Sequence, residues 1–330
     1  MSQAIPLIDD PDLDTLRPRL QADDPTVRRL ALIELAELED EAHLPWLLSA
    51  LQDPTVEVRT EAANRLASRE APATTEALLQ ALADPAAEVR EAAAHALSEL
   101  REPANGQLLL EAWQRHQPAG SAATGFALGA ILRGLRELRL NEAFEPAIEA
   151  TGHADAGVRQ EAVGVLGWLR RPEALPTLMA LTRNDADAGV RKAAAGALGF
   201  AQDTIVLQAL SQALQDAHWP VREEAATTLG KLRIGESLQP LIEALNDDFW
   251  QVRQRAARAL GRLKDPAAVP ALVTSALVHS SANLRKEAAI ALGEIADPSA
   301  GPALRQASED PDPEVRKSAR LALALIDTTR

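Results

Sequence analysis

The sequence contains no cysteine and no tyrosine, and only nine of its 330 residues are Trp or Phe. Without cysteine the chain has no disulfide, no thiolate-held iron–sulfur cluster or zinc, and no cysteine nucleophile. Aromatic residues make up 3 % of the chain and hydrophobic residues 46 %, so Ala, Leu and Val must form the core. These absences exclude disulfide-rich scaffolds and cysteine-dependent enzymes.

Long apolar runs are also missing. No stretch approaches the ~18 consecutive apolar residues that a membrane-spanning helix needs. The first ten residues, MSQAIPLIDD, lack the basic flank and the apolar stretch of a signal peptide. We therefore expect a cytoplasmic protein with no membrane partner.

Positive charge is scarce at the N-terminal end. The net charge is −14, and residues 1–100 carry 20 acidic and 8 basic side chains. Affinity for nucleic acids comes largely from Lys and Arg side chains that neutralise phosphates. General nucleic-acid binding is therefore not expected.

An internal repeat is the main positive signal. Val-Arg or Leu-Arg, followed by small residues and a Leu, recurs at intervals of 31 or 32 residues, with one interval of 69. The long interval holds one disguised repeat, in which Gly125 stands at the Arg position and Leu132 at the Leu position. Ten repeats result, and their arginines are Arg28, Arg59, Arg90, Arg159, Arg191, Arg222, Arg253, Arg285 and Arg316.

Each repeat reads as two helices. In residues 311–326, Asp312 is a good N-cap and Pro313 suits the first helical turn. A buried stripe is expected at Val315, Ala319, Leu323 and Ile326. One helix pair cannot bury its own apolar face, whereas stacked pairs share a continuous core. The sequence therefore predicts an all-α fold, a right-handed α-solenoid of about ten two-helix repeats of ~31 residues.

Small residues mark where second helices of neighbouring repeats approach closely. Alanine pairs follow the repeat arginine by three and four positions, as in Ala62/Ala63, Ala225/Ala226 and Ala256/Ala257. Gly199 and Gly230 follow the repeat Leu and are interpreted as close-packing positions. Neither belongs to a phosphate-binding loop.

The repeat unit carries a family resemblance. DPDPEVRKSARLAL resembles the short HEAT-like repeats of phycobilisome-lyase-type (PBS lyase HEAT-like) proteins, over about residues 12–327. That superfamily includes bilin lyase subunits, deoxyhypusine hydroxylases and many binding scaffolds, so the resemblance implies a fold more than a function.

Catalytic and metal-binding patterns are absent from the sequence. The hydroxylases bind iron through His-Glu pairs, and this chain has no His-Glu dipeptide. His153 and His279 occupy turn positions where other repeats have Asp. No phosphate-loop, nucleophile-elbow or zinc-protease motif occurs. We expect no catalytic residue, no metal and no cofactor.

The repeat arginines have two readings. Each falls at the edge of its helix's buried stripe, where it can reach turn carbonyls and aspartates of its own and the next repeat. We interpret the nine as a structural Asp–Arg ladder; contact with a ligand is the alternative.

A candidate groove lies on the second helices of repeats 5 to 8, which would line the concave surface. Aromatic and basic residues gather at these positions, and this combination is typical of interface hot spots. The candidate residues are Trp168, Phe200, Trp219, Trp250, Lys231, Arg255, Arg258 and Arg262. Two alternatives stay open, namely packing with local ion pairs (Arg255 with Glu224 and Glu287) and dimerisation.

The expected domain organisation is one solenoid over residues 12–327 after a flexible segment at residues 1–11. A stretch rich in Pro, Gly, Ser and Ala, QPAGSAAT, lengthens the irregular repeat at about 104–138. This repeat is a candidate hinge.

Three functions are considered. The first is a non-catalytic protein-binding scaffold, adaptor or assembly chaperone that holds a protein or peptide on its concave face. The alternative, implied by resemblance alone, is a phycobilin lyase subunit or bilin-protein chaperone, with a bilin and a second HEAT-like chain as partners. A deoxyhypusine-hydroxylase-like metalloenzyme is disfavoured by the missing His-Glu pairs.

Overall fold

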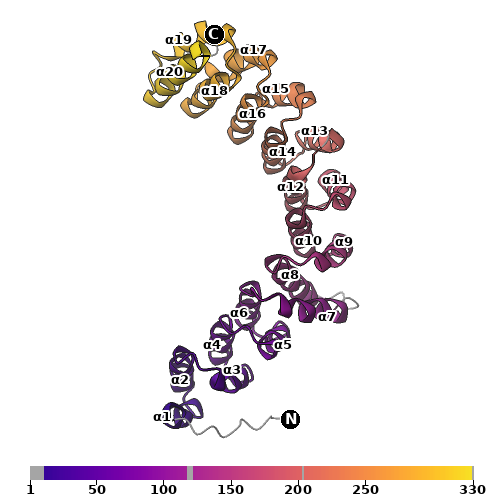
Figure 1. Cartoon of the computed structure of the whole chain (residues 1–330), viewed down its shortest axis with the longest axis vertical. Coiled ribbons are helices and arrows are strands. Elements are labelled where there is room, and N and C mark those ends of the chain that lie inside the picture. The colour runs from indigo at the N-terminus through magenta and orange to yellow at the C-terminus, as the bar shows by residue number, and fades with distance from the viewer. Residues whose placement is uncertain (1–10, 117–121, 203, 329–330) are drawn as a thin grey trace. The chain divides into compact units, whose positions relative to one another are not determined.

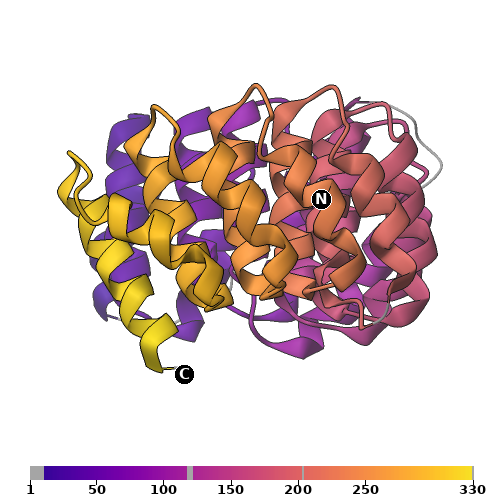
Figure 2. The same ribbon diagram turned by 90° about the horizontal axis from the view of Figure 1, so that it is seen from above.

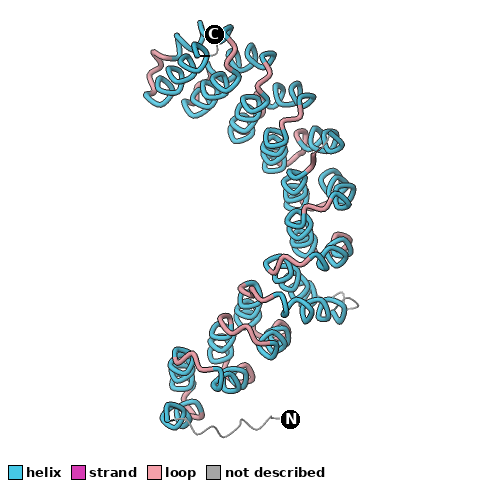
Figure 3. The backbone as a smooth tube through the Cα atoms, viewed as in Figure 1, coloured by secondary structure: helices cyan, strands magenta, loops and turns pink. Residues whose placement is uncertain are grey.

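The computed structural model describes residues 11–116, 122–202 and 204–328, and within them every regular element is a helix (Figures 1 and 3). The α-helices form ten pairs, as the sequence predicts. The first helices of the pairs are α1 (Pro11–Leu20), α3 (Leu44–Ala50), α5 (Pro72–Ala81), α7 (Gly106–His116), α9 (Phe144–Ala150), α11 (Leu175–Asn184), α13 (Leu207–Ala213), α15 (Leu238–Ala244), α17 (Val269–Ala271) and α19 (Gly301–Ala307). The second helices are α2 (Pro25–Glu37), α4 (Val56–Leu66), α6 (Ala87–Ser98), α8 (Ala122–Glu137), α10 (Ala156–Leu169), α12 (Ala188–Ala197), α14 (Trp219–Leu232), α16 (Trp250–Leu263), α18 (Ala282–Ile295) and α20 (Pro313–Thr328).

The chain forms two compact units, Met1–Leu169 with α1–α10 and Arg170–Arg330 with α11–α20. Within each unit the first helices form one layer and the second helices form another (Figure 1). In the second unit, α16, α18 and α20 pack side by side, as the orange-to-yellow helices in Figure 2 also show. The predicted continuity of one solenoid over 12–327 stays a prediction, and the expected flexible segment lies outside the described residues except for Pro11.

The turn before each second helix explains where that helix begins. Before α20, the carboxylate of Asp312 accepts hydrogen bonds from the backbone N–H groups of Glu314 and Val315. Pro313 occupies the first helical position, where its fixed φ suits a helix and no N–H is needed. The sequence-based N-cap is therefore confirmed.

The core is built from the small and branched residues that the repeat predicts. Both members of the alanine pairs Ala62/Ala63, Ala225/Ala226 and Ala256/Ala257 are fully buried. In α20 the buried stripe is Val315, Ala319, Ala322 and Ile326, so the expectation for Leu323 is wrong. Leu323 is only half-buried because it lies off this stripe, and none of the described helices packs beyond α20.

The irregular repeat lies inside the first unit, as α7 and α8. Its predicted loop is shorter than the QPAGSAAT stretch, because the last three residues of that stretch already belong to α8. Residues 117–121 of the loop lie outside the described residues, and the hinge stays a prediction.

The ninth repeat differs in its first helix. A π-helix at Leu272–Leu277 follows the single turn of α17. The interval from Arg253 to Arg285 is 32 residues, one more than the usual 31. A π-bulge accommodates one extra residue within a helix, and here the bulge leaves the side chain of Val278 70 % exposed.

Candidate binding surface

Each repeat arginine closes the turn that precedes its own second helix. The Nη1 atom of Arg222 donates hydrogen bonds to the backbone oxygens of Asp216 and Ala217, at 2.7 and 3.3 Å. The same contacts, to the residues six and five positions earlier, are made by Arg28, Arg59, Arg90, Arg159, Arg191, Arg253, Arg285 and Arg316.

The remaining guanidinium donors tie one repeat to the next. In Arg222, Nε and Nη2 donate to the two carboxylate oxygens of Asp247 at 2.6 and 2.9 Å. Oδ1 of Asp247 also accepts a hydrogen bond from the backbone N–H of Phe249. The five pairs of this kind are Arg28–Asp53, Arg59–Asp84, Arg191–Asp216, Arg222–Asp247 and Arg285–Asp310.

These carboxylates titrate below their ordinary range. Burial raises the pKa of the Asp247 carboxyl, but hydrogen bonds from Arg222 and from the Phe249 N–H, together with nearby positive charge, outweigh it and lower the pKa. For Asp84 the hydrogen bond from Arg59 is the largest influence and lowers the pKa. Both partners of each pair are therefore charged at neutral pH.

The Arg253 rung of the ladder is incomplete. Arg253 keeps both turn contacts, but its buried Nε has no hydrogen-bond partner. The aspartate position of the next repeat holds His279, whose Nδ1 accepts the hydrogen bond from the Ser281 N–H. The histidine thus performs the turn-capping half of the aspartate's role and not the pairing half. The prediction that His153 and His279 are turn residues is confirmed.

Replacing His279 with aspartate should complete this rung. His279→Asp is expected to raise the free energy of unfolding by about 1 kcal/mol, the value of one hydrogen-bonded pair. The measurement is a urea titration followed by far-ultraviolet circular dichroism.

The chain offers a matched control at His153, which caps its turn through Nδ1 in the same way. The preceding repeat has Gly125 where an arginine would be. His153→Asp should therefore give no gain. Equal stabilisation by the two variants would mean that the gain comes from turn capping and not from Arg253.

Aromatic side chains gather at the N-terminal ends of α14 and α16. Trp219 and Phe249 stack with ring centroids 5.6 Å apart and an interplanar angle of 17°. The Arg222 guanidinium lies 5.5 Å from the centroid of the Phe249 ring. Phe249 is 41 % exposed and Trp250 is 52 % exposed. Two large aromatic residues at one helix start are therefore largely open to solvent.

The basic candidates lie farther along the same helices. Lys231 is exposed in the last turn of α14, and Arg262 is half-buried in the last turn of α16. Trp219 and Lys231 are twelve residues apart, so about 18 Å of helix separates them. The aromatic and basic candidates thus mark opposite ends of the second helices.

Arg255 and Arg258 are engaged in ion pairs between repeats. Nε of Arg255 lies 3.1 Å from Oε1 of Glu223. Arg258 donates to both carboxylate oxygens of Glu287, at 2.6 and 3.0 Å, and Glu287 is almost fully buried. The expected partners of Arg255 were Glu224 and Glu287, so the ion-pair alternative holds with different partners.

Trp168 and Phe200 belong to different units. Trp168 ends α10 in the first unit, is 45 % exposed and has the Arg139 guanidinium 4.9 Å from its ring centroid. Phe200 ends the 3₁₀ turn Leu198–Phe200 in the second unit and is half-buried. Each belongs to the surface of its own unit.

The residue that sequence reasoning missed is Phe249, which was regarded as packing beneath a turn. It completes the cluster of Trp219, Phe249 and Trp250, named here the aromatic edge. The signal was its position directly before Trp250 in the turn sequence DDFW.

Two kinds of site have no support within the described residues. No group of three or more His, Asp or Glu side chains is arranged there to hold a metal ion. Over the same ranges, no helix is both long and apolar enough to span a membrane.

Solved structures with similar folds include both engineered and natural proteins. An engineered protein matches with a TM-score of 0.53 and 21 % identity, covering 96 % of this chain and 99 % of that one. Importin beta matches with a TM-score of 0.63 and 18 % identity over 96 % of this chain, which spans about half (51 %) of importin beta. Kap95 in a Kap95:Nup1 complex matches with a TM-score of 0.65 and 15 % identity, over 97 % of this chain and 51 % of that chain.

At these identities the likeness shows the fold alone. No curated protein sequence matches this one. The model of HEAT repeats, however, matches residues 13–98, 57–129, 127–199, 180–248 and 238–324, which together span nearly the whole chain. With ten helix pairs at the same spacing, the chain belongs to the HEAT repeat family.

Proposed function

We propose that the protein is a non-catalytic protein-binding scaffold that captures a polypeptide partner on the aromatic edge of its second unit. The observation that carries the proposal is the exposure of Phe249 and Trp250 beside the stacked Trp219. Exposed Trp and Phe with a neighbouring Arg have the composition of interface hot spots. A scaffold built from repeats suits this task because each repeat adds a few side chains to an extended contact.

The chemistry of the edge favours a segment with apolar side chains. The Trp219–Phe249 stack offers a flat apolar surface whose one polar neighbour, Arg222, is already paired with Asp247. Burial of an aromatic side chain on such a surface contributes about 1.5–3 kcal/mol. Solved structures with this fold include Kap121p bound to the extreme C-terminus of the phosphatase Cdc14p, which supports a polypeptide ligand for the fold.

The finer alternatives keep the same fold. A bilin lyase subunit, or a chaperone for bilin proteins, rests on the resemblance of the repeat to PBS lyase HEAT-like proteins and would place a flat tetrapyrrole against the aromatic edge. Visible absorbance after mixing the purified protein with a bilin tests that reading. An assembly chaperone or a cytoplasmic adaptor would instead hold a client protein.

The test compares the wild type with the double variant Trp219→Ala/Trp250→Ala. Cross-linking in native host lysate and mass spectrometry identify the partner, and calorimetry with the purified partner measures its affinity. The double variant is expected to weaken binding by at least about 100-fold, since two hot-spot residues each contribute about 2 kcal/mol.

Ile205→Ala is the matched control, because Ile205 is an exposed apolar residue beside the first helices of the same unit. It should leave the affinity unchanged. Unchanged affinity in the double variant, with a normal helical spectrum, would refute the aromatic edge as the binding site.

A further inference from the structure

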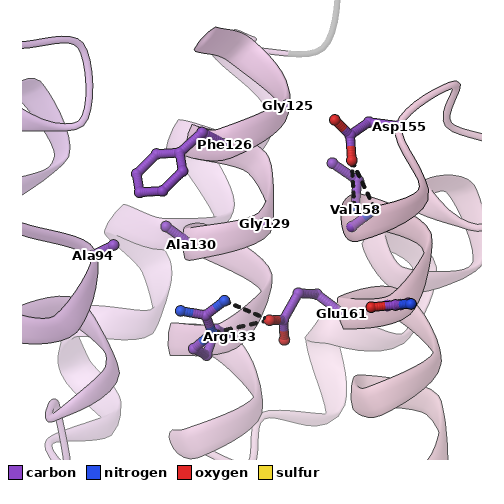
Figure 4. Close-up of a pocket in the computed structure, with 11 residues that line it drawn as sticks. Ala94, Gly125, Phe126, Gly129, Ala130, Arg133, Asp155, Val158 and Glu161 are labelled. Atoms are coloured by element: carbon purple, nitrogen blue, oxygen red, sulfur yellow. Dashed lines mark hydrogen bonds and ion pairs between the residues drawn. The ribbon is translucent and has the colours of Figure 1, made fainter. Parts of the chain in front are cut away.

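The first unit has a cavity that the ordinary repeats fill with side chains. It lies over α8, where Gly125 stands at the ladder-arginine position and Gly129 stands four residues later (Figure 4). The cavity has a volume of about 340 Å³. Ala94 on α6 and Ala130 on α8 add small side chains to its lining, so the two glycines and two alanines leave a trough along the second-helix layer.

One wall of the trough is aromatic and the other is acidic. Phe126 follows Gly125 on α8 and is 38 % exposed. Asp155 faces α8 from the start of α10 (Figure 4). Its Oδ1 accepts hydrogen bonds from the backbone N–H groups of Gly157 and Val158, at 2.7 and 3.3 Å. Its Oδ2 would lie 3.1 Å from a Cβ at Gly125, so this oxygen points into the space that the missing side chain leaves.

The other charges that line or flank the trough are paired with one another. Arg133 donates to Glu161 at 2.6 and 3.0 Å, and Arg136 approaches the second oxygen of Glu161 at 3.3 Å. Arg136 also donates to Glu137 at 3.0 Å. Two arginines and two glutamates therefore balance, and the carboxylate of Asp155 remains as the net charge of the trough.

The whole first unit carries the same sign of charge. Residues 1–169 hold 28 acidic and 14 basic side chains, whereas residues 170–330 hold 20 of each. The entire net charge of −14 thus belongs to the first unit. A field of this sign attracts a basic partner and repels an acidic one.

We propose that this trough binds the guanidinium group of an arginine presented by a partner polypeptide. A guanidinium is flat, weakly hydrated and stacks on aromatic rings, so it can lie over the glycine surface against Phe126 and donate to Oδ2 of Asp155. An ammonium group is compact and strongly hydrated and would gain less from the flat apolar floor. The site belongs to a different unit from the aromatic edge, and its test does not depend on that proposal.

The test titrates N-acetyl-arginine amide into the full-length protein and follows the backbone amide resonances of Gly125, Gly129 and Gly157 by NMR. Saturable shifts are expected with a Kd in the range of about 10–50 mM for a single side chain. N-acetyl-citrulline amide, a neutral isostere, should give no saturable shift. The lysine derivative should bind at least about threefold more weakly.

Two variants separate binding from folding. Gly129→Leu fills the trough, and because its Cβ would meet only Glu161 at 3.9 Å, the helix should fold at least as stably as the wild type. It should abolish the arginine-dependent shifts. Asp155→Asn keeps a good helix N-cap and removes the charge, and it should weaken binding about three- to fivefold.

Asp312→Asn is the control, because Asp312 caps α20 through the same two backbone contacts and has no trough beside it. It should leave arginine binding unchanged. The proposal is overturned if arginine gives no saturable shift up to about 50 mM, if citrulline shifts the same resonances equally, or if Gly129→Leu binds as the wild type does.

Discussion

Arg222→Met is expected to lower the free energy of unfolding by about 3 kcal/mol. The substitution removes four hydrogen bonds, two to the turn carbonyls and two to Asp247. It also leaves the carboxylate of Asp247, whose side chain is only 9 % exposed, without its charged partner. Hydrogen bonds to charged groups contribute about 1.5–3 kcal/mol each, and an orphaned buried charge adds a penalty. Methionine keeps the apolar contact with Phe249.

The neighbouring repeat supplies the control for this prediction. Arg253 makes the same two turn contacts and has no carboxylate partner on its Nε. Arg253→Met should therefore cost only about 1 kcal/mol. Urea titrations of the two variants, read by far-ultraviolet circular dichroism, give the difference that the Arg–Asp pair contributes. Equal losses would show that the turn contacts, and not the pairs between repeats, hold the ladder together.

The same pair predicts how stability depends on pH. The folded-state pKa of Asp247 lies below the unfolded value of about 3.9. The pair's contribution is therefore fully present above the unfolded pKa and is lost as the pH falls through the folded pKa. Between pH ~5 and pH ~2, the wild type should lose more stability than Arg222→Met. The two curves should converge at the acid end.

The repeat spacing predicts much of the fold because each repeat solves the same packing problem. An arginine at the start of a second helix, an aspartate 25 residues later and an alanine pair between them recur in five complete copies. One extra residue between Arg253 and Arg285 was visible in the sequence. Its structural result, a π-helix, depends on how the neighbouring layer holds the helix ends.

The contacts between exposed residues of neighbouring helices were harder to predict. Arg258 reaches Glu287 across 29 residues, whereas Arg255 reaches back to Glu223 across 32. A helical wheel gives the angle of a side chain but not the stagger between adjacent helices, which decides these pairs. Phe249 was missed for a related reason, since an apolar residue at an N-cap can turn toward the core or toward solvent.

Glycine positions on the last second helices show where those helices approach most closely. Gly230, Gly261 and Gly293 occur eight residues after the repeat arginine. A Cβ at each would lie 2.7–2.9 Å from an alanine Cα or Cβ of the next second helix. The sequence-based reading of Gly230 as a close-packing position agrees with this geometry. Any side chain there must push two helices apart.

Gly261→Ala is therefore expected to destabilise the protein although alanine is the better helix former. A Cβ at Gly261 would lie 2.7 Å from the Cα of Ala291 and 2.8 Å from Oε2 of Glu294. Backbone atoms cannot rotate out of the way, so α16 and α18 must separate, at a cost of about 1–3 kcal/mol after the gain in helix propensity. Gly235→Ala is the control, because a Cβ there would meet nothing within 4 Å. It should be neutral or stabilise by up to about 1 kcal/mol. Urea titration compares the two, and a Gly261→Ala variant as stable as Gly235→Ala would mean that the second helices slide apart freely and do not form a close-packed layer.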